Sequence, residues 1–97
     1  MNNILKVLEN NKHIFIPFSE VYVFGSVLTT NKPNDIDILL VYQPKIILIS
    51  NIKELKNNLI KTISNYTCLD IDFTTLSIQE LKKSSFLTKL PLYVKIL

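Results

Sequence analysis

Four acidic residues stand out, because all the aspartates of this 97-residue chain fall into two Asp-Ile-Asp triplets at positions 35–37 and 70–72. Each triplet lies in a hydrophobic stretch, and alternation along a strand would point both of its carboxylates to one face. Carboxylates gathered on one patch repel each other unless a cation is present. If the two strands are neighbours, the pattern predicts a site for a hard divalent ion, and Mg²⁺ suits few carboxylates combined with phosphates.

The only glycine of the chain, Gly25, ends the apolar run 21–24 and is followed at once by Ser26. An average chain of this length would hold about seven glycines. A lone glycine at a strand end therefore indicates a backbone requirement there. Gly25 would let a phosphate approach the backbone closely, and the following amides and the Ser26 hydroxyl could donate hydrogen bonds to it. Phosphate donors beside metal-binding acids are what phosphoryl transfer with two metal ions requires.

Each motif alone has a simpler explanation. A Gly-Ser pair after a strand is usually only a turn, and an Asp-x-Asp beside a loop often serves turn or cap chemistry. Their order is far more specific: a strand, Gly-Ser, a short loop, Asp-x-Asp on a strand, a helix, and a further strand aspartate.

Length and composition predict a single domain over residues 1–97, with 47% hydrophobic residues to build a core. We expect a cytoplasmic protein, because only one cysteine is present and no secretory signal or membrane span is evident. All 11 basic residues are lysines. Bidentate arginine is the commonest base contact in duplex DNA, so a nucleic-acid partner is not expected, nor is a membrane partner.

Periodicity predicts a helix over residues 2–10, strands over 20–25, 35–42 and 67–75, and a loop over 26–34. A further helix should begin with Asn51 as its cap and end near Asn65, while the run 46–49 is ambiguous. Ser77 to Glu80 fits a capping box that starts a last helix. Cys68 is expected to be buried, and residues 90–93 to add an edge element. The order predicts an α/β (α+β) domain with a small mixed sheet packed with helices.

Two segments carry a family resemblance: VYVFGSVLTTNKPNDIDILLVY (21–42) and LDIDFTTLSIQEL (69–81). They resemble the DNA polymerase β-type nucleotidyltransferase superfamily. The likeness is greatest to its minimal stand-alone members, which pair with HEPN-domain partners in bacterial toxin–antitoxin loci. It runs from about residue 4 to residue 93 and implies a polymerase β-like nucleotidyltransferase fold.

The resemblance also implies residue roles. Gly25 and Ser26 would bind the nucleotide, while Asp35 and Asp37 would be catalytic and hold the metal. Asp72 would be the third carboxylate and metal ligand, because it is followed by an apolar strand end and a capped helix; Asp70 has the same facing and is the runner-up.

The implied activity is transfer of AMP from ATP, with two Mg²⁺ ions, to a hydroxyl of a HEPN-type toxin, which this chain would neutralise as an antitoxin. The sequence departs from the family pattern in two ways that concern triphosphate binding. Residues 27–30 lack the usual basic residue and second glycine, and only eight residues separate Ser26 from Asp35. The alternative is therefore an antitoxin without catalysis that neutralises its partner by binding alone.

Overall fold

One mixed β-sheet organises the chain in this computed structural model, which describes residues 3–97. The strand order is β3-β2-β1-β4. Strand β1 (Glu20–Phe24) pairs antiparallel with both β2 (Asp35–Tyr42) and β4 (Tyr93–Lys95). Strand β3 (Asp70–Ser77) pairs parallel with β2, so the connection between them crosses over through a helix, as parallel pairing requires.

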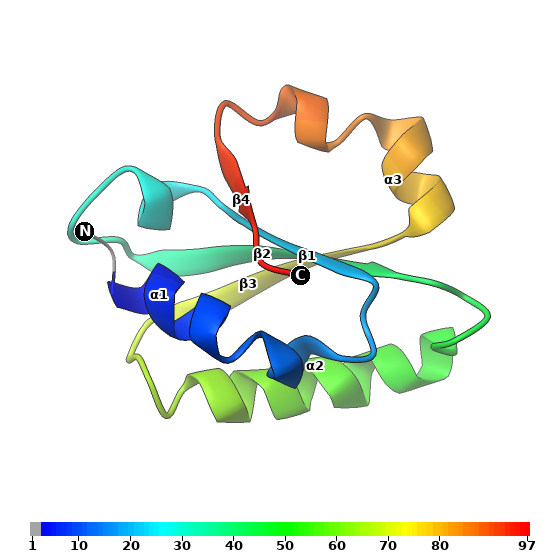
Figure 1. Cartoon of the computed structure of the whole chain (residues 1–97), viewed down its shortest axis with the longest axis horizontal. Coiled ribbons are helices and arrows are strands. Elements are labelled where there is room, and N and C mark those ends of the chain that lie inside the picture. Colours follow the sequence, from blue (N-terminus) through cyan, green and yellow to red (C-terminus); the bar gives the residue numbers. More distant parts are fainter. Residues whose placement is uncertain (1–2) are drawn as a thin grey trace.

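Helices cover the two faces of the sheet unequally (Figure 1). Helix α1 (Asn3–Asn10), the 3-10 turn η1 (Lys12–Phe15) and helix α2 (Ile49–Ile63) lie on one face. Helix α3 (Ile78–Ser84) and the 3-10 turn η3 (Leu87–Lys89) lie on the other. We call these the α2 face and the α3 face.

The larger core lies on the α2 face. Its strand residues alternate as a pleated sheet requires, with Val21 and Val23 from β1 and Ile36, Ile38 and Leu40 from β2. All five are completely buried. The helical contribution recurs at helical spacing on α2, as Ile52, Leu59 and Ile63.

A smaller cluster forms on the α3 face, where Tyr22, Leu39 and Val41 are buried beneath α3 and η3. The Ser77 hydroxyl accepts a hydrogen bond from the Glu80 amide at 3.1 Å, and the Glu80 carboxylate accepts one from the Ser77 amide at 2.8 Å. The predicted capping box is therefore present, and it starts α3 directly at the end of β3.

The fold class is confirmed, and strand β2 has the predicted bounds. The predicted cap of α2 is wrong: the helix begins at Ile49, with Leu48 preceding it, so Asn51 already lies inside the first turn. Strand β3 begins at Asp70, three residues later than predicted, and Cys68 in the preceding bend is exposed rather than buried. The edge element comes late too, at Tyr93–Lys95.

The first predicted helix is found as α1, although position 2 of that prediction lies outside the described residues. Among residues 3–97, no helix has the length and apolar character needed to cross a membrane.

Candidate metal and phosphate site

Three carboxylates meet on the α3 face of the sheet. Asp35, Asp37 and Asp72 each offer an oxygen, and these oxygens all lie within 4.8 Å of one another. Asp35 and Asp37 are half-buried and Asp72 is exposed. The sequence-predicted set of acids is thus brought together by the structure.

Strand register produces this meeting. In the parallel pair of β2 and β3, Asp37 is the partner of Asp72 and Asp35 is the partner of Asp70. Paired residues point to the same face, so all four carboxylates share one side of the sheet. Leu39, two residues after Asp37, lies under α3 on that same side, which fixes the facing of the acids.

Asp70 and Asp72 were alternatives for the third position. Both are exposed, but only Asp72 belongs to the group whose oxygens converge. Asp70 lies at the first residue of β3, opposite Asp35. The geometry therefore favours Asp72, while its role in chemistry stays a prediction.

The carboxylates perturb one another. Hydrogen bonding with Asp72, partial desolvation and the charges of Asp37, Asp72 and Asp70 all raise the pKa of Asp35 above its usual range. Burial, followed by the charge of Asp72, raises the pKa of Asp37. Both raised pKa values show that, without a cation, the negative charges of these carboxylates repel one another, and that the fold holds them together despite this repulsion.

Gly25 is required at its position by two independent constraints. Its backbone has φ +84° and ψ −157°, a conformation that residues with a side chain rarely adopt. A β-carbon added there would collide with the carboxylate of Asp37, whose Cγ would lie 3.0 Å away. The antiparallel register explains the closeness, because Phe24 is the partner of Asp37 across β1 and β2.

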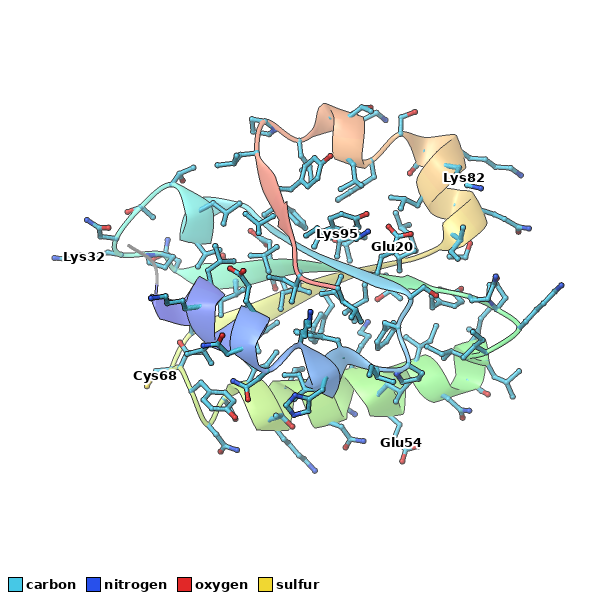
Figure 2. All side chains as sticks on the ribbon, in the orientation of Figure 1. Glu20, Lys32, Glu54, Cys68, Lys82 and Lys95 are labelled. Atoms are coloured by element: carbon cyan, nitrogen blue, oxygen red, sulfur yellow. The ribbon has the colours of Figure 1, made fainter. Side chains whose placement is uncertain are left out.

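The chain turns after Gly25 into a short 3-10 turn, η2 (Ser26–Leu28). The Leu28 amide donates to the Gly25 carbonyl at 3.1 Å, and the amides of Thr29 and Thr30 donate to the Ser26 carbonyl at 3.0 Å. The turn holds half-buried Ser26 directly after the residue that touches Asp37. Lys32 is exposed and projects outward from the following loop (Figure 2), and it is not among the groups that shift the pKa of Asp35 or Asp37.

The donor set fits a hard divalent cation. All three ligand candidates are carboxylates, which are the donors that Mg²⁺ and Mn²⁺ prefer. Within residues 3–97, no lysine forms an ion pair with them, so a bound cation would be the natural compensation for their charge. Asp35, Asp37 and Asp72 would hold such an ion.

Sequence reasoning gave no role to Phe24, which the structure places beside the acids. As the partner of Asp37 it faces the same side, and its ring packs edge-on against Phe86 at 5.6 Å between centroids. The pair forms a half-buried apolar wall next to the carboxylates. In the sequence, the position of Phe24 directly before Gly25 is the feature that could have indicated its place beside the site.

Comparison with known proteins supports the fold. No protein-family pattern matches the chain, and no characterised protein sequence matches it either. Among solved structures, it resembles a "putative nucleotidyltransferase" from Sulfolobus solfataricus, with a TM-score of 0.50 and 20% identity. The match covers 96% of this chain and 78% of that one. At this identity the likeness establishes a nucleotidyltransferase-like fold.

Proposed function

We propose that this protein is a metal-dependent nucleotidyltransferase that transfers AMP from ATP to a hydroxyl of a partner protein. The observation that carries the proposal is the convergence of three carboxylates within 4.8 Å beside the Gly25–Ser26 turn. The nucleotidyltransferase-like fold and the family resemblance of the two segments point the same way.

Under this proposal each residue has a separate task. Asp35 and Asp37 would hold two Mg²⁺ ions, which would neutralise the phosphates and align the attacking and leaving oxygens. Ser26, through its hydroxyl and its backbone amide, would hold the β- and γ-phosphates. Asp72 would orient the acceptor hydroxyl and take its proton, the acceptor oxygen would bond to the α-phosphorus, and pyrophosphate would leave as its bond to that phosphorus breaks.

Exposure of the site favours a large acceptor. Asp72 is exposed, and the apolar cluster under α3 and η3 covers only the other half of this face. A protein side chain could approach an open patch of this kind, whereas a small acceptor would have only the Phe24–Phe86 wall on one side to hold it. A HEPN-type toxin is the partner that the family resemblance suggests, and this chain would then act as its antitoxin.

The decisive experiment measures transfer of label from [α-³²P]ATP to a candidate HEPN-type partner, with Mg²⁺ and with EDTA. Asp37→Asn is expected to reduce transfer by at least about a hundredfold, because it removes a ligand needed for charge stabilisation. Asp70→Asn is the matched control, with the same chemical change outside the converging trio, and is expected to retain transfer. Equal activity of both variants would sink the proposed site.

A second candidate is an antitoxin that neutralises its partner by contact alone. It is favoured by residues 27–30, where Val, Leu, Thr and Thr occur in place of a basic residue and a second glycine. In that case the Asp37→Asn variant would still protect cells from the toxin, and no label would reach the partner.

A further inference from the structure

The outer edge of β3 is open along its whole length. β3 is the last strand of the sheet and has eight residues, and among residues 3–97 only β2 pairs with it. It contains neither proline nor lysine, the residues that commonly protect edge strands from pairing. Such an edge is a template for one more strand.

A stripe of α2 flanks this edge. Ile49, Lys53, Lys56 and Ile60 recur at spacings of four, three and four residues, which places them on one side of the helix. Two open grooves connect the stripe to β3. One, of about 590 Å³, is lined by Ile49, Lys53, Lys56 and Thr75. The other, of about 580 Å³, is lined by Ile60 together with Asp70, Ile71 and Asp72 of β3.

The stripe has apolar ends and a cationic centre. Ile49 is 74% exposed and Ile60 is 41% exposed, which is unusual for isoleucine. Lys53 and Lys56 lie between them, and no described carboxylate forms an ion pair with either. Glu80, which also lines the first groove, is already bonded to the Ser77 amide.

An unsatisfied hydroxyl lies in the same groove. Thr75 Oγ1 is buried, and among the described residues it is the one buried side-chain polar atom without a hydrogen-bond partner. Leaving a buried polar group unpaired costs about 1–3 kcal/mol. A docked segment that offers a partner to this hydroxyl would remove that cost, provided that the Thr75 side chain rotates toward the groove.

We propose that the β3 edge is a docking site for an extended segment of a partner protein that carries two acidic residues between two apolar ones. Ile49 and Ile60 are 11 positions apart, which is roughly 16 Å along the helix. A strand covers that distance in about five residue intervals, and six intervals, about 20 Å, is the nearest spacing that keeps both ends on one face. A seven-residue segment with an apolar residue at each end and acids at the third and fifth positions would place all four side chains on one face, toward the α2 stripe.

This site adjoins the carboxylate cluster, because Asp72 also lines the second groove, but it uses mainly the other face of β3. By alternation, Thr75 shares the α2 face with Ile71 and Phe73, which pack on the main core, whereas Asp72 points to the α3 face. Docking on this edge therefore does not depend on nucleotidyl transfer, and it can be tested without ATP.

The probe is a fluorescein-labelled peptide, Ile-Thr-Glu-Thr-Glu-Thr-Ile, measured by fluorescence anisotropy at low salt. The wild-type protein should bind it saturably. Lys53→Glu combined with Lys56→Glu should weaken binding at least tenfold and should create binding to the matching peptide with two lysines. Lys61→Glu is the control, because this exposed lysine is on the same helix but off the stripe. An equal loss in the control, or no binding by the wild type, would overturn the proposal.

Hydrogen exchange provides the second measurement. Peptide binding should slow exchange of backbone amides in β3, and Thr75→Val should weaken binding several-fold without altering α2. Binding with no change in β3 would contradict strand addition. A free protein that already sediments as a dimer with a protected β3 would show that a second copy occupies the edge, and this would contradict the proposal as well.

Discussion

The two halves of the α3 face are built by the same strands and have opposite properties. At one end, β2 presents Leu39 and Val41, which are completely buried under α3 and η3. At the other end, two and four residues before Leu39, the same face presents Asp37 and Asp35, which are half-buried. A step of two residues along β2, from Asp37 to Leu39, therefore separates a charged surface from a packed core.

The two halves therefore have opposite effects on stability, since the apolar half stabilises the fold and the acidic half destabilises it. The apolar half contributes through burial, whereas the acidic half collects charges that raise the pKa values of Asp35 and Asp37. Function-bearing patches commonly carry such local costs because the rest of the fold maintains them.

The largest effect is expected in the apolar half. Leu39→Ala should lower the free energy of unfolding by about 2–5 kcal/mol, since it removes a completely buried side chain and leaves a cavity. Urea unfolding followed by circular dichroism measures this change. Leu92→Ala is the control at an exposed leucine and should change little. Similar losses in both variants would show that the α3 cluster is not a packed core.

The junction of the two halves comes next. Gly25→Ala should destabilise the protein by about 1–3 kcal/mol, because alanine is strained at φ +84° and its β-carbon would displace Asp37. It should also weaken binding of divalent ions, which isothermal titration calorimetry can measure. Ser26→Ala, one residue along, keeps the backbone free of strain and should leave the stability nearly unchanged. A stable Gly25→Ala variant with normal metal binding would contradict the close approach.

Binding of a divalent cation should offset the loss of stability that charge repulsion causes in the acidic half. With 10 mM Mg²⁺ and an affinity near 1 mM, binding to the native state alone would add about 1.4 kcal/mol of stability. In a domain of this size that raises Tm by several degrees. Differential scanning fluorimetry should show the rise in the wild type and in Asp70→Asn, and none in Asp37→Asn. A rise that survives Asp37→Asn would place the ion elsewhere.

The smallest expected effect is on pH dependence. Asp35 and Asp37 have pKa values above the ordinary 3.8 in the folded protein, so folding favours their protonated forms. The contribution of these two carboxyl groups to the stability of the folded protein is therefore most favourable below about pH 3.8. It is lost as the pH rises through their raised pKa values. Without metal, Asp37→Asn should become more stable than the wild type, by up to about 1 kcal/mol, between pH 4 and pH 7. Unfolding in EDTA across that range tests this, and a constant difference between the two proteins would refute it.

Local patterns predicted the elements well where a strong signal was present. The alternation of β2 and the capping box at Ser77 both occur where the residues indicate. The start of α2 was misplaced because Asn51 is a good cap residue, yet helical packing of the chain begins two residues before it. Cys68 was expected to be buried with its apolar neighbours, but the chain is still in a bend there and β3 begins only at Asp70.

The shared facing of the two carboxylates in each triplet follows from the residue order alone, because alternation along a strand is independent of the neighbouring strands. The residue order also indicates that a glycine is needed after β1. The convergence of Asp72, rather than Asp70, with Asp35 and Asp37 is visible only in the folded protein, as is the closeness of Gly25 to Asp37. Both outcomes depend on the register between strands that are distant along the chain, and register results from packing the whole sheet against its helices.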